Sequence, residues 1–434
     1  QMSSYHMILT VLDRRLEEDY IAFFRKNNIH QFCAALGCGT ATKSILDYLG
    51  VENNEKIVIN FIVPGGKVAP LFAGRVALIT APSGRSSDNV GSIDVLRQNF
   101  DLRLLLAPEH GVRGDMPAGA LFDGGVDRVS GLPVMSMYSR DSKRLPRAAL
   151  DGFDTLVYDI QDVGCRYYTF ISTLKIALED CAANGKRLVV LDRPNPLGAS
   201  TEGCVLDRAV ESFVGCYDIP ARYGLSCGEF ALMLNAEEKL GCELHVVPCE
   251  GLTRGMSFPD WGKPWVMPSL AMPRYETALL YPGTCLIEGT NCSEGRGTAD
   301  PFAIIGAPFV DAEELCREFS ALALPGAAAT PVYFTPTASK HCGELCGGVQ
   351  LHVMDADALR PYELGVRLLD LLRRLYPDDF RFLPPVRADG KPFISLLAGH
   401  RELEKPDWDA DALLARAECE SAEFALRCEK YRLY

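Results

Sequence analysis

The chain has 434 residues, of which 44 are Lys or Arg and 57 are Asp or Glu, so its formal net charge is −13. A hydrophobic content of 48% is ordinary for a globular protein, and the length predicts two or three domains. The negative charge argues against a protein that binds nucleic-acid phosphates or an anionic membrane surface. The sequence has no uncharged apolar run of the roughly 18 residues that a membrane-spanning helix needs.

The start of the chain and its cysteines indicate the compartment. No charged segment followed by an apolar one stands at the start, so no secretory signal is predicted and a cytoplasmic location is expected. The 16 cysteines are scattered, and no two have Cys-x-x-Cys spacing. His341, Cys342 and Cys346 come nearest to a metal motif, but no second histidine stands near enough to complete it. We therefore expect reduced thiols, no metal and no cofactor.

Residues 1–66 are predicted to form a unit of three strands and two helices. The strands are expected at residues 7–12, 32–36 and 57–63, and the helices at residues 17–27 and 44–49. Leu-Gly-x-Gly-Thr-Ala at 36–41 and Ile-Leu-Asp-Tyr-Leu-Gly at 45–50 resemble the front half of P-II-type signalling proteins. This resemblance implies a ferredoxin-like half unit. Alternatively, the segment packs on a neighbour, and its open strand edges would allow a homo-oligomer.

Residues 67–240 alternate between strands and helices, which predicts a Rossmann-like, doubly wound parallel sheet. The strands are expected at residues 76–80, 102–106, 155–158 and 188–191, and the helices at residues 92–98, 171–183 and 227–239. No Gly-x-Gly-x-x-Gly follows the first of these strands, so a dinucleotide site is not expected.

Polar residues follow all four strands, at residues 80–84, 107–115, 159–162 and 192–196. Because ligands bind beyond the carboxyl ends of strands in open α/β sheets, these segments are expected to line one crevice. The segment 107–115 places Glu109, His110, Arg113 and Asp115 within nine residues. A salt-bridged loop is the alternative, and the recurrence of polar clusters at the other strand ends argues against it.

Residues 241–434 are predicted to form a smaller mixed α/β domain that completes the cleft. Its strands are expected at residues 244–248 and 349–353, and its helices at residues 361–375 and 410–431. The segment 288–298, Glu-Gly-Thr-Asn-Cys-Ser-Glu-Gly-Arg-Gly-Thr, combines three glycines with many polar side chains. Such a segment does not build a core, so it is interpreted as a loop that contacts a ligand.

Carboxyl groups and arginines in these clusters suit the hydrolysis of an acidic glycoside. Glycoside hydrolysis needs a proton donor for the leaving oxygen, and Glu109, just beyond an apolar strand, fits that requirement. His110 would orient Glu109 or contact substrate, or else has only a structural role. Four arginines indicate a carboxylate-bearing ligand. The further candidate carboxylates are Asp115, Asp159, Asp162, Glu288 and Glu294, and the arginines are Arg113, Arg166, Arg193 and Arg296.

Residues 68–434 resemble the NamZ-type exo-β-N-acetylmuramidases. The matching motifs are Ala-Pro-Glu-His-Gly-Val-Arg-Gly at 107–114, Tyr-Asp-Ile-Gln-Asp-Val-Gly-Cys-Arg-Tyr-Tyr-Thr at 158–169, Leu-Asp-Arg-Pro-Asn-Pro-Leu-Gly at 191–198, and the segment 288–298. The resemblance implies a cleft between a Rossmann-like and a smaller domain, and removal of N-acetylmuramic acid from the non-reducing end of peptidoglycan fragments. It also implies that Glu109 is the catalytic acid, that the arginines bind the lactyl carboxylate, and that relatives are often exported.

The motifs and clusters together give the candidate site. The expected catalytic residues are Glu109, His110 and Asp159. The expected substrate-binding residues are Arg113, Asp115, Gln161, Asp162, Arg166, Tyr168, Asp192, Arg193, Asn195, Glu202, Asn291, Glu294, Arg296 and Thr298.

Three short segments depart from the family's pattern. Thr-Ala-Pro-Ser-Gly at 80–84 and Pro-Ser-Leu-Ala-Met-Pro at 268–273 each lack an asparagine that the family usually has, and Tyr223 stands where histidine is common. An alternative function is therefore a binder or sensor of muropeptide-type sugars, either non-catalytic or with altered specificity. A further alternative is an enzyme that is regulated by a nucleotide bound to residues 1–66.

Overall fold

The computed structural model of the chain describes residues 69–434, except 87, 117–123, 138–141 and 386–389, together with three short strands nearer the N-terminus. The chain divides into two compact units, Gln1–Leu71 and Phe72–Tyr434, and each is described by itself. Within the described ranges, no helix is long and apolar enough to cross a membrane.

The N-terminal unit contains a small antiparallel sheet. Its strands are β1 (Val11–Asp13), β2 (Ala35–Gly37) and β3 (Lys56–Val58), in the order β1-β3-β2. Both pairings are antiparallel, and each strand overlaps one of the three predicted ranges. The helices predicted at residues 17–27 and 44–49 lie outside the described residues.

The larger unit contains a seven-stranded sheet in the order β10-β9-β8-β4-β5-β7-β6. All neighbouring strands run parallel except the short edge pair of β6 and β7. Every residue of the central strands β4 and β8 is buried, as expected for parallel strands covered on both faces. The strands are β4 (Val76–Thr80), β5 (Leu102–Ala107), β6 (Gly125–Val126), β7 (Pro133–Ser136), β8 (Thr155–Asp159), β9 (Arg187–Leu191) and β10 (Glu243–Val247).

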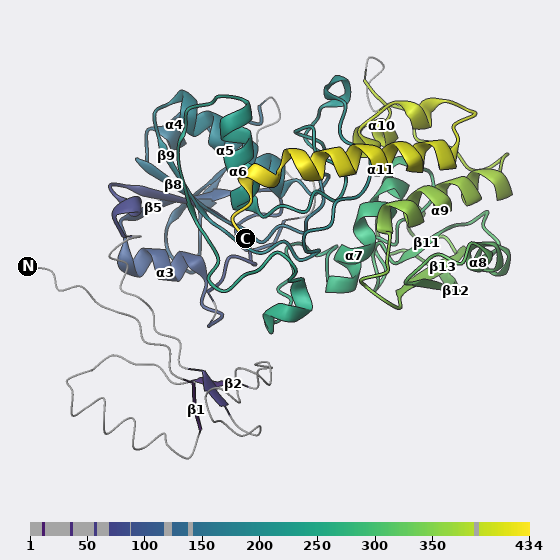
Figure 1. The fold of residues 1–434 in the computed structure, drawn as a ribbon, viewed down its shortest axis with the longest axis horizontal. Helices are drawn as coiled ribbons and strands as arrows, with labels where there is room; N and C mark the ends of the chain where they lie inside the picture. The colour runs from purple at the N-terminus through teal and green to yellow at the C-terminus, as the bar shows by residue number, and fades with distance from the viewer. Residues whose placement is uncertain are drawn as a thin grey trace, which may run out of the picture. The chain divides into compact units, whose positions relative to one another are not determined.

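Helices cover both faces of this sheet, and Figure 1 shows α3 on the opposite side from α5. They are α3 (Ser92–Asn99), α4 (Arg147–Leu150), α5 (Phe170–Ala183) and α6 (Cys227–Glu237). The four strands and three helices predicted between residues 76 and 239 are confirmed to within two residues at each end. Because β10 pairs with β9, the large sheet extends beyond residue 240, where the sequence predicted a domain boundary.

The last third of the chain builds a second lobe on an antiparallel sheet in the order β11-β13-β12. Its strands are β11 (Ile304–Ala307), β12 (Ala327–Phe334) and β13 (Cys346–Val353). Its helices are α7 (Tyr275–Thr284), α8 (Ala312–Ala321), α9 (Pro361–Leu375), α10 (Phe393–Ala398) and α11 (Ala410–Arg427).

The end of the chain returns to the first lobe. In Figure 1 the yellow helix α11 runs from the second lobe back toward the large sheet. The hydroxyl of Tyr434 donates to Oδ2 of Asp192 over 2.7 Å, and the backbone amide of Leu433 donates to Glu229 over 2.8 Å. These bonds tie the two lobes together at the carboxyl ends of the strands.

Helices α7 and α9 cross at two glycines. A Cβ atom at Gly283 would overlap the carbonyl oxygen of Pro361, and one at Gly365 would overlap the backbone of Gly283. The close crossing therefore requires glycine at both positions. Helix α7 continues directly into the 3-10 helix η5 (Cys285–Gly289), which carries Glu288 into the site described next.

Candidate active site

Residues from both lobes line a cavity of about 720 Å³, named here the Glu109 cavity. Its volume lies in the range of small-molecule sites. The first lobe contributes the end of β5 and the start of α5, and the second lobe contributes η5, the loop after it and a segment near residue 340. The residues that line it include Glu109, His110, Tyr168, Thr169, Ser269, Ala271, Met272, Tyr281, Glu288, Glu294, Arg296, Phe302 and Lys340.

A tight turn after β5 presents Glu109. His110 and Gly111 follow with φ values of +73° and +78°, so two consecutive residues adopt the left-handed conformation. This conformation is uncommon for a residue with a side chain and marks a turn that its surroundings hold in place. The Nδ1 atom of His110 lies 3.2 Å from the carbonyl oxygen of Met116, which fixes the imidazole ring beside the cavity.

Thr169 connects Glu109 to helix α5. Thr169 stands at the N-cap of α5, but its hydroxyl makes no capping bond and donates instead to Oε2 of Glu109. The carboxylate thus lies at the helix end where the backbone dipole is positive. The charge of Glu109 also acts on Lys143, whose side chain is exposed: desolvation lowers the pKa of this lysine, and the negative charge of Glu109 opposes the fall.

Two acids and two cations form the opposite wall. The Nε atom of Arg296 lies 2.7 Å from Oε1 of Glu288 and 3.4 Å from Oε1 of Glu294. The ammonium of Lys340 lies 2.9 Å from Oε2 of Glu294 and donates to two backbone carbonyl groups as well. Burial raises the pKa of Glu288, while the charge of Arg296 opposes the rise. The wall therefore holds carboxyl groups and cations in a fixed arrangement.

Aromatic rings complete the lining. The ring of Tyr281 packs edge-on against Tyr168 and Phe302, with centroid distances of 5.9 and 4.7 Å. The guanidinium of Arg296 lies 5.0 Å from the centroid of Phe302. The hydroxyl of Tyr168 is buried and has no hydrogen-bond partner among the described residues. A ligand with an apolar face and polar edges suits such a lining.

The structure brings five of the expected site residues into this cavity: Glu109, His110, Tyr168, Glu294 and Arg296. Glu288, which the sequence offered as a further carboxylate, joins them. Sequence reasoning missed Thr169 and Lys340 as site residues. Thr169 ends the motif at 158–169 and was therefore within reach, whereas Lys340 stands in a segment without any motif.

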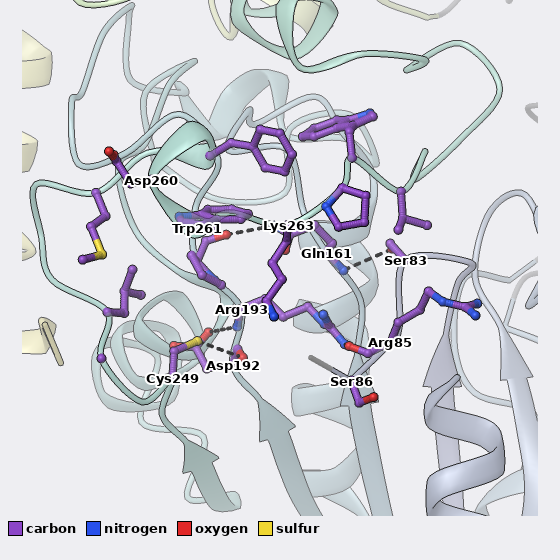
Figure 2. Close-up of a pocket in the computed structure, with 18 of the residues that line it drawn as sticks. Ser83, Arg85, Ser86, Gln161, Asp192, Arg193, Cys249, Asp260, Trp261 and Lys263 are labelled. Carbon is purple, nitrogen blue, oxygen red and sulfur yellow. Dashed lines mark hydrogen bonds between the residues drawn. The ribbon is translucent and has the colours of Figure 1, made fainter. Parts of the chain in front are cut away.

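Three other expected residues, Gln161, Asp192 and Arg193, line a second cavity of about 560 Å³. Figure 2 shows this cavity beyond the ends of the strands, and it is named here the strand-end cavity. The carboxylate of Asp192 accepts from four donors, namely the hydroxyls of Ser226 and Tyr434 and the backbone amides of Arg193 and Gly228. Asp159, expected to be catalytic, lines neither cavity, because Arg193 pairs with it over 2.6 Å and the Ser92 hydroxyl donates to it.

Two of the four expected arginines bind protein groups instead of facing a cavity. Arg166 is fully buried and donates to the carbonyl oxygens of Cys204, Ile219, Leu397 and Ala398, so it ties the two lobes together. Arg113 pairs with the buried Asp127 over 2.8 Å.

The remaining expected residues also lie outside the Glu109 cavity. Asp115 is exposed. Burial raises the pKa of Asp162 to about 7, and its Oδ1 accepts from the amide of Gly164 and the hydroxyl of Tyr223. Asn195, Asn291 and Thr298 bond to backbone groups of nearby loops, and Glu202 accepts the amides of Tyr362 and Glu363 at the start of α9. Within the described part of the chain, no group of three or more metal-ligating side chains is placed to hold a metal ion.

Comparison with known proteins agrees with this two-lobed arrangement. The family model for the N-terminal part of the exo-beta-N-acetylmuramidase NamZ matches residues 76–276, and the model for its C-terminal part matches residues 279–434. A Bacillus subtilis (strain 168) protein named peptidoglycan beta-N-acetylmuramidase NamZ is 45% identical over 312 residues, which cover 71% of this chain and 75% of that protein.

Two crystal structures of DUF1343 family proteins from Bacteroides fragilis share the fold. One has a TM-score of 0.75 and 35% identity, covering 84% of this chain and 95% of that one. The other has a TM-score of 0.65 and 29% identity, covering 85% and 96%. Together with the family models, these likenesses span both lobes and both walls of the Glu109 cavity, and the chain belongs to the NamZ family of exo-β-N-acetylmuramidases.

Proposed function

We propose that this protein is an exo-β-N-acetylmuramidase, which releases N-acetylmuramic acid from the non-reducing end of peptidoglycan fragments. The observation that carries the proposal is the Glu109 cavity, in which the carboxyl group bound by Thr169 faces a wall of acids and cations. The 45% identity to a protein named peptidoglycan beta-N-acetylmuramidase supports it. The reaction belongs to cell-wall turnover and recycling.

Glu109 is the proton donor in this account. Cleavage of a glycosidic bond leaves an alkoxide unless an acid protonates the departing oxygen. Glu109 lies at the cavity surface, held by the Thr169 hydroxyl, and the adjacent His110 is fixed by the Met116 carbonyl group. A second carboxylate, from Glu288 or Glu294 across the cavity, stabilises positive charge on the sugar ring or activates water.

Arg296 and Lys340 recognise the carboxylate that distinguishes muramic acid from other amino sugars. Both cations line the cavity, and both already contact carboxylates of the protein. A guanidinium can hold a substrate carboxylate through two parallel hydrogen bonds, and an ammonium adds a point charge. The aromatic rings of Tyr168, Tyr281 and Phe302 enclose the apolar face of the sugar.

One of the three segments that depart from the family's pattern lies at this cavity. Ser269, Ala271 and Met272, all within residues 268–273, line it. Here the sugar meets a hydroxyl, a methyl group and a thioether where the family's pattern has an amide. Of the other expected residues, Asp159, Arg113, Arg166 and Asp162 are assigned positioning roles, because each is engaged with protein groups outside the cavity.

The test is hydrolysis of 4-nitrophenyl β-N-acetylmuramide, with the matching N-acetylglucosaminide in parallel. Turnover of the muramide alone is expected, because only that sugar carries the carboxylate for Arg296 and Lys340. Saturable binding of the muramide without turnover would contradict the enzymatic function and support the alternative, a binder or sensor of muropeptide-type sugars. Turnover of both sugars at equal rates would contradict the role of the two cations.

We also propose that residues 1–66 form a P-II-like half unit. The antiparallel order β1-β3-β2, with the third strand between the first two, supports this proposal, because the front half of a ferredoxin-like unit has that order. A nucleotide-regulated enzyme would show a thermal shift with adenine nucleotide that disappears when residues 1–66 are deleted. A shift that survives the deletion would contradict nucleotide binding by this unit.

A further inference from the structure

The strand-end cavity is not used by the proposed reaction. It is lined by residues that follow β4, β8, β9 and β10, and by a segment from Met256 to Val266. Among the described residues, it shares no lining side chain with the Glu109 cavity. Its place beyond the carboxyl ends of parallel strands is where open α/β sheets bind ligands, and its volume of about 560 Å³ suits a small molecule.

One wall of the strand-end cavity is aromatic. Phe258 packs edge-on against Trp261 and Trp265, with centroid distances of 5.2 and 5.0 Å, so the three rings support one another. The indole nitrogen of Trp265 donates to the carbonyl oxygen of Met272 over 3.0 Å, which fixes that ring. The indole N–H of Trp261 is buried without a hydrogen-bond partner in the described part of the chain. Such a wall offers a flat apolar surface to the cavity.

The opposite wall carries planar polar groups in fixed positions. Arg193 pairs with Asp159 through Nε and donates through Nη2 to the carbonyl oxygen of Arg85 over 2.8 Å. The amide nitrogen of Gln161 donates to the carbonyl oxygens of Asp162 and Pro194, which sets the plane of the amide. In Figure 2 the side chains of Arg193 and Lys263 extend into the space between the strand ends and the aromatic rings.

These two walls together select a class of ligand. A flat apolar surface facing fixed guanidinium and amide groups fits a pyranose ring, whose axial hydrogens form an apolar face and whose hydroxyls bond to planar polar groups. The lining gives a simple anion no net positive charge, because the cations Arg85, Arg193 and Lys263 are matched in number by the acids Asp192, Glu250 and Asp260. Asp159, which lies outside the cavity, also pairs with Arg193. The geometry therefore favours an uncharged sugar.

A single segment forms the wall between the two cavities. Trp265 and Val266 line the strand-end cavity, while Ser269, Ala271 and Met272 line the Glu109 cavity. The hydrogen bond from Trp265 to Met272 links the two sides of this wall. A ligand that packs on Trp265 therefore acts on the same short segment that contacts the substrate.

We propose that the strand-end cavity is a second saccharide-binding site, which holds an uncharged amino-sugar unit of a peptidoglycan glycan outside the Glu109 cavity. The choice of this glycan rests on the proposed function, whereas the site itself rests on the two walls. The site would keep the enzyme bound to long glycan fragments. It would not contribute to the hydrolysis of a substrate with a single sugar unit.

The experiment is calorimetric titration of the full chain with N,N′-diacetylchitobiose, a neutral disaccharide of N-acetylglucosamine. Trp261→Ala is expected to weaken binding by about tenfold or more, and Trp261→Phe to retain most of it, because the ring is kept. Ala271→Trp, which fills the Glu109 cavity, is expected to leave this binding intact. Tyr333→Ala is the matched control, since it removes an exposed aromatic ring on β12.

The outcomes separate this site from the proposed function. Trp261→Ala is expected to hydrolyse 4-nitrophenyl β-N-acetylmuramide at the unaltered rate but to show a raised KM for long glycan fragments. Absence of saturable binding to the unaltered protein, or binding that Ala271→Trp abolishes and Trp261→Ala leaves intact, would overturn the second site. Binding as described without any muramide turnover would refute the proposed function and leave the second site standing.

Discussion

The hydroxyl of Thr169 donates a hydrogen bond to Oε2 of Glu109, joining the first residue before α5 to the turn after β5. The two residues are 60 positions apart in the sequence, and only the parallel pairing of the sheet brings their segments together. A hydroxyl that would ordinarily cap its own helix is instead used to hold a carboxyl group at a cavity.

Replacing Thr169 tests whether this bond positions Glu109. Thr169→Val removes the donor at nearly constant volume and is expected to lower kcat by about 10- to 100-fold. The bond stabilises the negative charge that Glu109 gains as it gives up its proton, and bonds to charged groups contribute roughly 1.5–3 kcal/mol. KM should change little, because the hydroxyl is committed to Glu109. Thr169→Ser keeps the donor and should restore most of kcat. Equal losses in both variants would mean that the methyl group, and not the hydrogen bond, is what matters.

Lys340 is expected to recognise the carboxylate of the sugar. Lys340→Gln removes a charge 2.9 Å from Glu294, and the inhibition constant of N-acetylmuramic acid should rise by about tenfold. The inhibition constant of N-acetylglucosamine, which lacks the lactyl group, should stay constant. Lys405→Gln is the control, because Lys405 also pairs with a glutamate but is exposed. An equal rise in the inhibition constants of both sugars would show that the variant disturbs the segment around Lys340 as a whole.

Asp162 is expected to make the protein less stable as the pH rises from about 4 to 7. Burial raises the pKa of Asp162 to about 7, so across this interval the folded protein keeps a proton that the unfolded chain releases. Ionisation of Asp162 in the folded protein lowers the free energy of unfolding by at most about 4 kcal/mol. Asp162→Asn keeps the oxygen that accepts from Gly164 and cannot ionise.

Chemical unfolding of both proteins at pH 5 and pH 7 measures this effect. Burial also raises the pKa of Glu202 to about 7, so Glu202 lowers stability as the pH rises, as Asp162 does, and it does so in both proteins. Burial lowers the pKa of His400 to about 3, so this group makes the folded protein more stable as the pH rises. Below the ordinary pKa of histidine, the unfolded chain binds a proton that the folded protein does not. The difference between the two proteins therefore isolates Asp162. An identical pH dependence in the variant would show that Asp162 is ionised in the folded state.

The crossing of α7 and α9 predicts a strong effect of a single methyl group. Gly283→Ala would place Cβ against the carbonyl oxygen of Pro361 and should lower the free energy of unfolding by about 1–3 kcal/mol or more. Gly255→Ala is the control, since nothing lies within 4 Å of the added atom there, and its effect should stay within about 0.5 kcal/mol. Thermal unfolding of the two variants compares them directly. Equal stability would show that the helices move apart at no cost.

The large sheet could be predicted from the sequence because its strands are short apolar runs bounded by turn residues. Val76–Thr80 and Thr155–Asp159 are buried throughout, and their largely apolar residues predict this burial. The extent of the sheet was harder to predict, because β10 is only half-buried, with alternating polar side chains. Its pairing with β9 depends on the helix between them and not on its own pattern.

The candidate site was only partly predictable, because residue type does not reveal a side chain's partners. Glu109 and His110 stand at a strand end, where position alone indicates a ligand. Arg166 stands in an equally polar motif, yet its guanidinium serves four backbone carbonyl groups from both lobes. Lys340 reaches the cavity only through the packing of the second lobe, and no sequence motif around it predicts a role in the site.

The most direct test of the account is the kinetics of Glu109→Gln on two muramides with different leaving groups. The N-acetylmuramic acid–N-acetylglucosamine disaccharide needs an acid to protonate its departing oxygen, so its hydrolysis should fall by about 10²- to 10⁴-fold. The 4-nitrophenyl muramide, whose leaving group departs without a proton, should lose much less. Glu313→Gln, an exposed change on α8, is the control. Undiminished hydrolysis of the disaccharide by Glu109→Gln would contradict the assignment of Glu109 as the proton donor.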